Sequence, residues 1–132
     1  MAKPSAARLL IADDDPNILA AYVLFFAGHG YDIRTAGDGV SALAEYRVWR
    51  PAIVVLDVQM PDMDGRAVAR EIRRLQSKPV PLLVAVTGLS SPSAHAQSIG
   101  SGFDFHFVKP ANLLVVLAAI AAAGIALGAT DP

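Results

Sequence analysis

The chain has 132 residues, of which 11 are Lys or Arg and 12 are Asp or Glu, so its formal net charge is -1. This balance disfavours a nucleic-acid binder, which needs a basic face. Hydrophobic residues make up 54% of the chain, which argues against a disordered chain. The chain has no Cys, which excludes disulfides, thiolate catalysis and Cys-ligated zinc. The length predicts one domain, which we place at residues 8–127, between tails at 1–7 and 128–132.

The chain shows no membrane or secretion signal in the segments where one is expected. The start, Met1 to Arg8, lacks the apolar core of a secretory signal. The most apolar run, Leu113 to Leu127, is shorter than the ~20 residues that a spanning helix needs. We therefore expect no membrane insertion and a cytoplasmic location.

Strand-like and helix-like segments alternate along the chain. The predicted strands are Arg8–Ala12, Asp32–Ala36, Ile53–Asp57, Leu82–Thr87 and Phe105–Val108. The predicted helices are one that begins after the cap Asp15 at Pro16 and ends at Gly28, then Val40–Trp49, Gly65–Gln76, Ser93–Ile99 and Asn112–Leu127. The third and fourth strands are apolar without alternation, as is typical of strands covered on both faces. Repeated βα units of this kind predict an α/β fold, a doubly wound five-stranded parallel sheet with helices on both faces.

Polar residues end or directly follow four of these strands. They are Asp13-Asp14-Asp15, Asp57, Thr87-Gly88 and Lys109-Pro110. Ligands of an open parallel sheet bind beyond the carboxyl ends of its strands, so these groups meet at one edge. Asp15 alone is explained as a helix N-cap, but Asp13, Asp14 and Asp57 would repel one another without a cation. Three oxygen donors of this kind favour Mg²⁺.

The remaining groups suit phosphoryl transfer to a carboxylate. Lys109 can pair with a carboxylate or a phosphoryl oxygen, and Thr87 can donate a hydrogen bond to another oxygen. A metal ion and an ammonium group keep the acceptor carboxylate ionised and neutralise the transferring group. The product of such a transfer is an acyl phosphate.

These motifs resemble the receiver domain of two-component response regulators over about Arg8 to Leu127. The resemblance rests on four segments: Leu9–Asp15, Val55–Gly65, Val84–Gly88 and Val108–Pro110. It implies the flavodoxin-like strand order 2-1-3-4-5. It also implies a signalling module that is no turnover enzyme, although it assists its own phosphorylation and slow dephosphorylation. The expected phosphodonor is a histidine kinase or a histidine phosphotransfer domain.

The resemblance also implies residue roles. It makes Asp57 the phosphoacceptor and assigns Mg²⁺ or Mn²⁺ to Asp13, Asp14, Asp57 and the backbone carbonyl of Gln59. It makes Thr87 the switch hydroxyl and Lys109 the phosphoryl-binding lysine. It also gives structural roles to Gly65 and to Pro110, which would follow a cis peptide bond. His106 stands where the family most often has a switching Tyr or Phe. The alternative reading of His106 is a half-exposed strand residue.

Two other function classes compete with this reading. A phosphatase of the haloacid-dehalogenase type places a second Asp two residues after its nucleophile, whereas this chain has Gln59 there. The other alternative is a receiver-fold module for interaction or dimerisation that is never phosphorylated. The complete set of acidic, hydroxyl and lysine residues argues against it.

The predicted surface is uneven in charge. Residues 16–31 and 110–130 contain no charged side chain, so we expect the first and last helices to share an apolar patch that binds a partner or forms a homodimer. Basic residues gather near the third helix, namely Arg66, Arg70, Arg73, Arg74 and Lys78. For these we favour a solvated helix face over a nucleic-acid footprint. The uncharged helix Ser93–Ile99 is the expected moving element.

Overall fold

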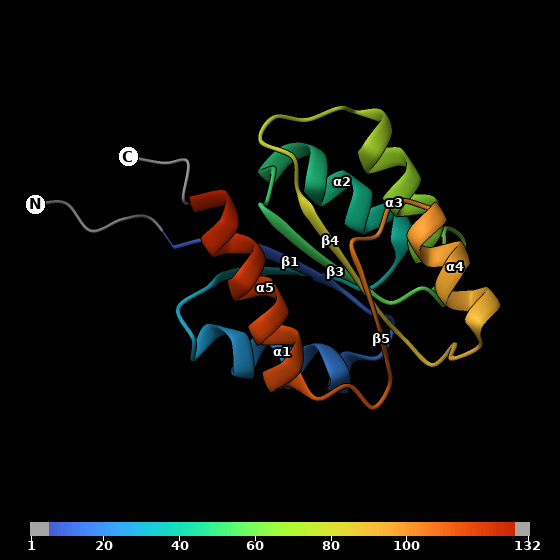
Figure 1. The fold of residues 1–132 in the computed structure, drawn as a ribbon, viewed down its shortest axis with the longest axis horizontal. Helices are drawn as coiled ribbons and strands as arrows, with labels where there is room; N and C mark the ends of the chain where they lie inside the picture. The colour runs from blue at the N-terminus through green and yellow to red at the C-terminus, as the bar shows by residue number, and fades with distance from the viewer. Residues whose placement is uncertain (1–5, 129–132) are drawn as a thin grey trace, which may run out of the picture.

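The computed structural model describes residues 6–128, in which strands and helices alternate as expected (Figure 1). Within this range the strands are β1 (Arg8–Ala12), β2 (Asp32–Ala36), β3 (Ile53–Leu56), β4 (Leu82–Thr87) and β5 (Phe105–Val108). The helices of the same range are α1 (Pro16–Ala27), α2 (Gly39–Trp49), α3 (Gly65–Arg74), α4 (Pro92–Gly100) and α5 (Leu113–Gly128).

The strands form one parallel sheet in the order β2-β1-β3-β4-β5. Its central register pairs Ile11 with Val55 and Val55 with Val84. These apolar residues are buried, as the lack of alternation in the sequence predicts. The predicted doubly wound α/β sheet and its strand order are therefore confirmed. Because every strand runs the same way, their carboxyl ends share one edge.

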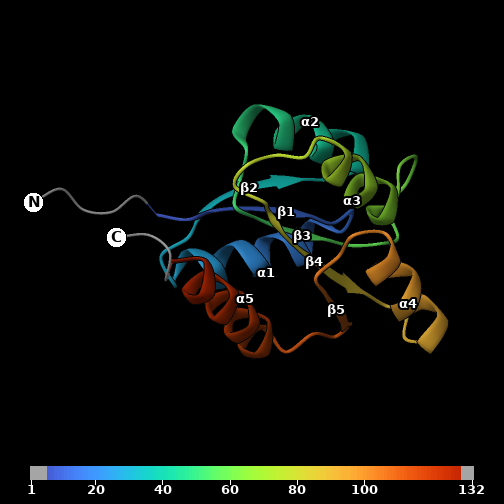
Figure 2. The ribbon, with the colours of Figure 1, turned by 45° about the horizontal axis from the view of Figure 1, so that its top comes forward.

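Helices cover both faces of the sheet (Figure 2). α1 and α5 lie on one face, α2 and α3 lie on the other, and α4 lies beside the edge strand β5. Alternate residues of β1 serve the two cores: Leu9 packs with Phe26 and Ile120, whereas Leu10 packs with Tyr46. The period-two direction of strand side chains explains how one short strand supports two cores.

The helix starts follow from side-chain caps. Asp15, Asp38, Asp64 and Ser91 each accept a backbone N–H from the first turn of the helix that follows. This confirms the capping role predicted for Asp15.

The end of α3 differs from the prediction. The helix ends at Arg74, because Gln76 has a φ of 49°, in the left-handed region that a right-handed helix cannot include. Leu75, which the sequence pattern placed inward, is the C-cap residue and is 36% exposed. The third strand also ends one residue early, at Leu56, so that Asp57 belongs to the loop.

Part of the basic face predicted to be solvated contacts α4, residues 101–104 after it and Pro81. That prediction is therefore wrong for the half-buried Arg66 and Arg73, whereas Arg70 stays exposed. The pairs are Arg66 Nη2 to Ala94 O at 3.1 Å, Arg70 Nη1 to Ser101 Oγ at 3.2 Å, Arg73 Nε to Gly102 O at 2.9 Å, Arg73 Nη1 to Pro81 O at 2.8 Å and Arg73 Nη2 to Asp104 Oδ2 at 2.9 Å. Sequence spacing on one helix does not reveal contacts that the fold makes with distant loops. These arginines hold both ends of the uncharged α4 against α3.

The uncharged helices α1 and α5 lie side by side on the same face, as expected (Figures 1 and 2). They expose large apolar side chains: Leu24 is 79%, Leu114 63% and Val115 51% exposed. Within residues 6–128, no helix combines the length and the apolar character needed to cross a membrane.

Candidate functional site

The carboxyl ends of the central strands carry the acidic residues. The backbone N–H of Asp57 donates to Ala12 O at 2.9 Å, and that of Asp13 donates to Ala36 O at 3.1 Å. These bonds extend the sheet ladder one residue beyond β1 and β3. Asp13 and Asp57 therefore leave adjacent strands at the same level.

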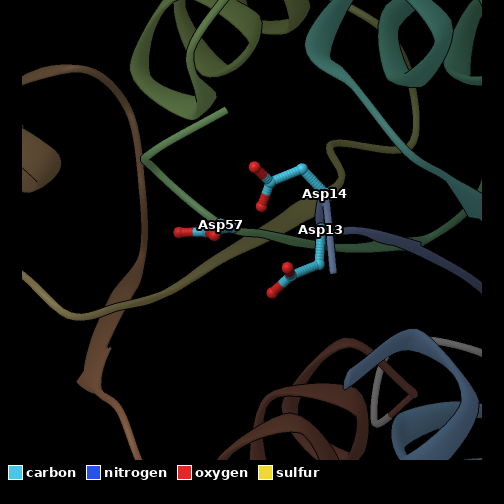
Figure 3. Close-up of side chains that lie close together, drawn as sticks. All are labelled: Asp13, Asp14 and Asp57. Atoms are coloured by element: carbon cyan, nitrogen blue, oxygen red, sulfur yellow. The ribbon is translucent and has the colours of Figure 1, made fainter. Parts of the chain in front are cut away.

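The carboxylates of Asp13, Asp14 and Asp57 form one cluster (Figure 3). One oxygen from each lies within 4.8 Å of the others. Asp13 is 2% and Asp57 6% exposed, whereas Asp14 is exposed to solvent. The cluster therefore has a buried floor and one open side.

Local backbone groups orient the two buried carboxylates. Asp13 Oδ1 accepts the N–H of Asp15 at 2.9 Å, and Asp57 Oδ1 accepts the N–H of Gln59 at 3.1 Å. Each bond closes a tight turn directly after its strand. The second oxygen of each carboxylate is thereby left to face the centre of the site.

Lys109, which directly follows the edge strand β5, bridges the two buried carboxylates. Its Nζ donates to Asp13 Oδ2 at 2.8 Å and to Asp57 Oδ2 at 3.0 Å. The backbone N–H of Lys109 donates to Thr87 O at 2.8 Å, which fixes the lysine to the end of β4. The bond between Lys109 and Pro110 is cis, as the sequence resemblance implied.

Burial and charge act in opposite directions on these groups. Burial raises the pKa of Asp57 above its usual value, although the hydrogen bonds from Lys109 and Gln59 act to lower it. Burial lowers the pKa of Lys109, but hydrogen bonds to Asp13 and Asp57 outweigh it, so the net shift is upward. The lysine is therefore held in its charged form beside a carboxylate that is costly to ionise without further positive charge.

The donor set fits a hard divalent cation. Carboxylate and carbonyl oxygens are the ligands that Mg²⁺ and Mn²⁺ prefer. Asp14 is open to solvent, which leaves room for the water ligands that Mg²⁺ retains. The side chain of Gln59 is exposed, and its backbone follows the turn that holds Asp57.

The other predicted site residues lie around this cluster. Thr87 is fully buried at the end of β4, and its Oγ1 accepts the N–H of Leu89 at 3.3 Å. His106 is half-buried on β5, and its Nε2 bonds Leu89 O at 2.9 Å. The structure thus places both beside the loop after β4 and joins neither to a carboxylate among the described hydrogen bonds.

Gly65 allows α3 to begin close to the site. Its N–H donates to Val58 O at 2.9 Å, and a Cβ at this position would lie 2.3 Å from the backbone oxygen of Asp57. Only glycine permits this approach of the α3 start to the Asp57 loop. This contact gives a physical reason for the structural role that the sequence assigned to Gly65.

A cavity that the sequence does not predict lies beside Lys109. Its volume is about 380 Å³, and it is lined by Ile18, Tyr22, Lys109, Pro110, Ala111 and Leu113. Burial raises the pKa of Tyr22, so its hydroxyl is neutral at neutral pH. The apolar helix α1 and the loop after β5 therefore form one wall of the approach to Lys109. The only sequence signal was the uncharged first helix.

Curated relatives are response regulators. The chain is 34% identical to the DNA-binding response regulator MtrA of Mycolicibacterium smegmatis over 103 residues, which are 78% of this chain and 44% of that protein. It is 33% identical to the transcriptional regulatory protein PrrA of Mycobacterium leprae over 126 residues, 96% of this chain and 53% of that protein. The chain thus spans about half the length of the curated relatives that it matches.

Solved receiver structures share the fold. A CheY-like response regulator receiver domain protein from Methanospirillum hungatei JF-1 aligns with a TM-score of 0.83 and 28% identity, over 90% of this chain and 94% of that one. CheY in the CheX-CheY-BeF3-Mg complex from Borrelia burgdorferi aligns with a TM-score of 0.81 and 25% identity, over 89% and 88%. The family model of the response regulator receiver domain matches residues 9–121. The strand order and the acidic cluster agree with this match and with these relatives. The chain therefore belongs to the response regulator receiver domain family.

Proposed function

We propose that this chain is a phosphoacceptor signalling module whose acceptor is Asp57. The donor is a phosphohistidine on a histidine kinase or a histidine phosphotransfer domain. A carboxylate oxygen of Asp57 forms the new O–P bond, and the N–P bond breaks with its electron pair returning to the imidazole. The module carries the group and does not turn over a substrate.

One observation carries this proposal: Lys109 Nζ lies within hydrogen-bond distance of both buried carboxylates, while Asp14 keeps one side of the cluster open. A structural ion pair needs only one carboxylate, and three in one place need a further cation. Asp13, Asp14, Asp57 and the Gln59 carbonyl would hold Mg²⁺ or Mn²⁺, which supplies charge neutralisation for the acceptor and the transferring group. Lys109 would then exchange a carboxylate oxygen for a phosphoryl oxygen.

We assign the switching step to the loop after β4. Thr87 would turn its hydroxyl from Leu89 N–H toward the new phosphoryl oxygens, and His106, which bonds the carbonyl of Leu89, would follow that loop. The readout is then the surface of α4, β5 and α5. Phosphorylation would bias an equilibrium between two arrangements of this surface. The size of the population shift depends on how much more tightly one arrangement holds the phosphoryl group than the other.

The face of α1 and α5 is the proposed partner surface. Its exposed Leu24, Leu114 and Val115 suit a kinase or phosphotransfer helix, or a second copy of the chain. Light scattering over a concentration series tests the homodimer, and a strict monomer at high concentration would remove it. That this domain itself does not bind nucleic acid stays a prediction.

Intact-mass spectrometry tests the acceptor. The native chain is incubated with a small phosphodonor, such as acetyl phosphate, with Mg²⁺ or with chelator. We expect the gain of one phosphoryl group that requires Mg²⁺ and that Asp57→Asn abolishes. Asp62→Asn, an exposed carboxylate in the following loop, is the matched control and should label like the native chain.

An equal mass gain in Asp57→Asn would reject Asp57 as the acceptor. No gain from either small donors or a phosphorylated phosphotransfer domain would favour the unphosphorylated interaction module instead.

A further inference from the structure

Two of the three histidines of the chain lie in contact, and neither belongs to the acidic cluster. His95 is on α4 and His106 on β5, and their ring centroids are 5.1 Å apart with an angle of 61° between the ring planes. The pair does not come from helical spacing, because the packing of α4 against β5 brings the rings together. It therefore joins the edge strand to the helix beside it.

The hydrogen bond of His106 fixes the state of its ring. A backbone carbonyl only accepts, so Nε2 carries the proton in the 2.9 Å bond to Leu89 O. In the neutral ring, Nδ1 then has a free lone pair. This Nδ1 is buried and has no hydrogen-bond partner among the described residues. A buried polar atom without a partner is destabilising and calls for an explanation such as an ion or a water.

This arrangement is the one that metal-binding histidines use. One ring nitrogen binds the ion while the other donates its N–H to a backbone carbonyl, which fixes the tautomer and the orientation of the ring. Imidazole nitrogens bind at about 2.0–2.1 Å, so two rings in contact can share one ion. His95 is exposed, so its side chain can turn toward the ion without disturbing the core.

The ligand chemistry separates this pair from the acidic cluster. Imidazoles suit Zn²⁺, Cu²⁺ and Ni²⁺, whereas carboxylates and carbonyls suit Mg²⁺ and Mn²⁺. α4 carries no Asp or Glu, and the nearby arginines Arg66 and Arg70 donate to Ala94 O and Ser101 Oγ. The helix α4 and the strand β5 therefore offer these two imidazoles and no carboxylate.

We propose that His95 and His106 form a second metal site, which takes a divalent transition ion of the Zn²⁺, Cu²⁺ and Ni²⁺ class with water in its remaining positions. The bound ion ties α4 to β5. It also holds the Leu89 carbonyl through the N–H of His106, in the loop that follows Thr87. The site stands independently of whether Asp57 accepts a phosphoryl group.

The test uses tag-free, chelator-treated protein in excess Mg²⁺, so that the acidic cluster is already filled. Ni²⁺ is titrated by calorimetry, and substoichiometric Cu²⁺ is added while the histidine ring signals are followed by NMR. We expect one Ni²⁺ per chain and selective Cu²⁺ broadening of His95 and His106. His95→Asn should weaken Ni²⁺ binding by about tenfold or more, since it removes one of two protein ligands.

His29→Asn is the matched control, because His29 is exposed at the end of α1 and bonds Phe25 O. It should leave Ni²⁺ binding unchanged. His106→Phe should act like His95→Asn, and the exposed position of His95 keeps the test decisive even where His106→Phe unfolds. Ni²⁺ affinity unchanged in His95→Asn, or Cu²⁺ broadening of all three histidines alike, would show the pair to be ring packing alone and would overturn the proposal.

Discussion

Replacing Lys109 by Met tests whether the lysine offsets the charge of the buried carboxylates. Met keeps an unbranched side chain and removes only the ammonium group that donates to Asp13 and Asp57 at 2.8 and 3.0 Å. The variant therefore leaves two nearly buried carboxylates without this counter-charge. We expect a loss of stability that depends on pH and on Mg²⁺.

The magnitude follows from how far each partner is buried. Removing one partner of a fully buried ion pair costs about 3–5 kcal/mol, whereas exposed pairs contribute about 0.2–1 kcal/mol. The Lys109 side chain is 23% exposed, so water screens part of the interaction. We expect the free energy of unfolding to fall by about 2 kcal/mol in chelator at neutral pH. For a chain of this size, that lowers Tm by roughly 8 °C.

The pH dependence follows from the direction of the Asp57 shift. Burial already raises the pKa of Asp57, and the loss of Lys109 removes a group that lowers it. A carboxyl with a raised pKa in the folded state costs stability above that pKa, and the cost disappears when it is protonated. The deficit of Lys109→Met is therefore largest at neutral pH and shrinks as the pH falls to and below the pKa of Asp57. Mg²⁺ should also reduce this deficit, because the ion supplies positive charge to the same carboxylates.

Urea unfolding followed by circular dichroism measures these differences, with chelator and with Mg²⁺, at neutral and mildly acidic pH. Lys78→Met, at an exposed lysine, is the control and should change stability little. If native and Lys109→Met protein are equally stable in chelator, or if Mg²⁺ leaves the deficit unchanged, Lys109 does not offset the charge of the buried carboxylates.

Three further changes test the surroundings of the site. Gly65→Ala should lower the free energy of unfolding in urea by more than about 2 kcal/mol, because its Cβ would meet the Asp57 backbone oxygen. Gly88→Ala is the control and should leave stability unchanged, because a Cβ there has ordinary space. Equal effects of the two substitutions would contradict this prediction. Arg73→Met should speed hydrogen exchange over residues 101–104, and unchanged exchange would exclude its anchoring role. Trp49 fluorescence should not change when Mg²⁺ is added. Trp49 lies by the amino end of β1, roughly 15 Å from the site at the carboxyl end of the strand. A clear change in fluorescence would argue against that placement.

The strands and the site could be predicted because their signals are local. Apolar runs bounded by polar residues give the bounds of β1, β4 and β5, and parallel strands bring the residues after them to one edge. The grouping of Asp13, Asp14 and Asp57 follows from that rule alone. The end of α3 was less accessible, because the backbone angle of Gln76 has no sequence signature.

Contacts that depend on the packing of distant elements could not be predicted. The arginines of α3 were expected in solvent because their spacing is that of an exposed face, yet Arg73 reaches both Pro81 and Asp104. Tertiary packing also places Lys109 Nζ between the carboxylates of Asp13 and Asp57. It likewise brings His95 into contact with His106. Each requires the relative placement of two elements to within an ångström or so.

A crystal structure with Mg²⁺ and beryllium fluoride, a mimic of the phosphoryl group, would show whether Asp57 is the acceptor and where the metal ion binds. We predict the beryllium adduct on Asp57, with Mg²⁺ held by Asp13, Asp14, Asp57 and the Gln59 backbone carbonyl, at about 2.0–2.1 Å from the oxygens that bind it directly. Lys109 Nζ should then bond a fluorine in place of a carboxylate oxygen of Asp57. An adduct on another carboxylate, or a metal ion outside the cluster of Asp13, Asp14 and Asp57, would contradict the claim.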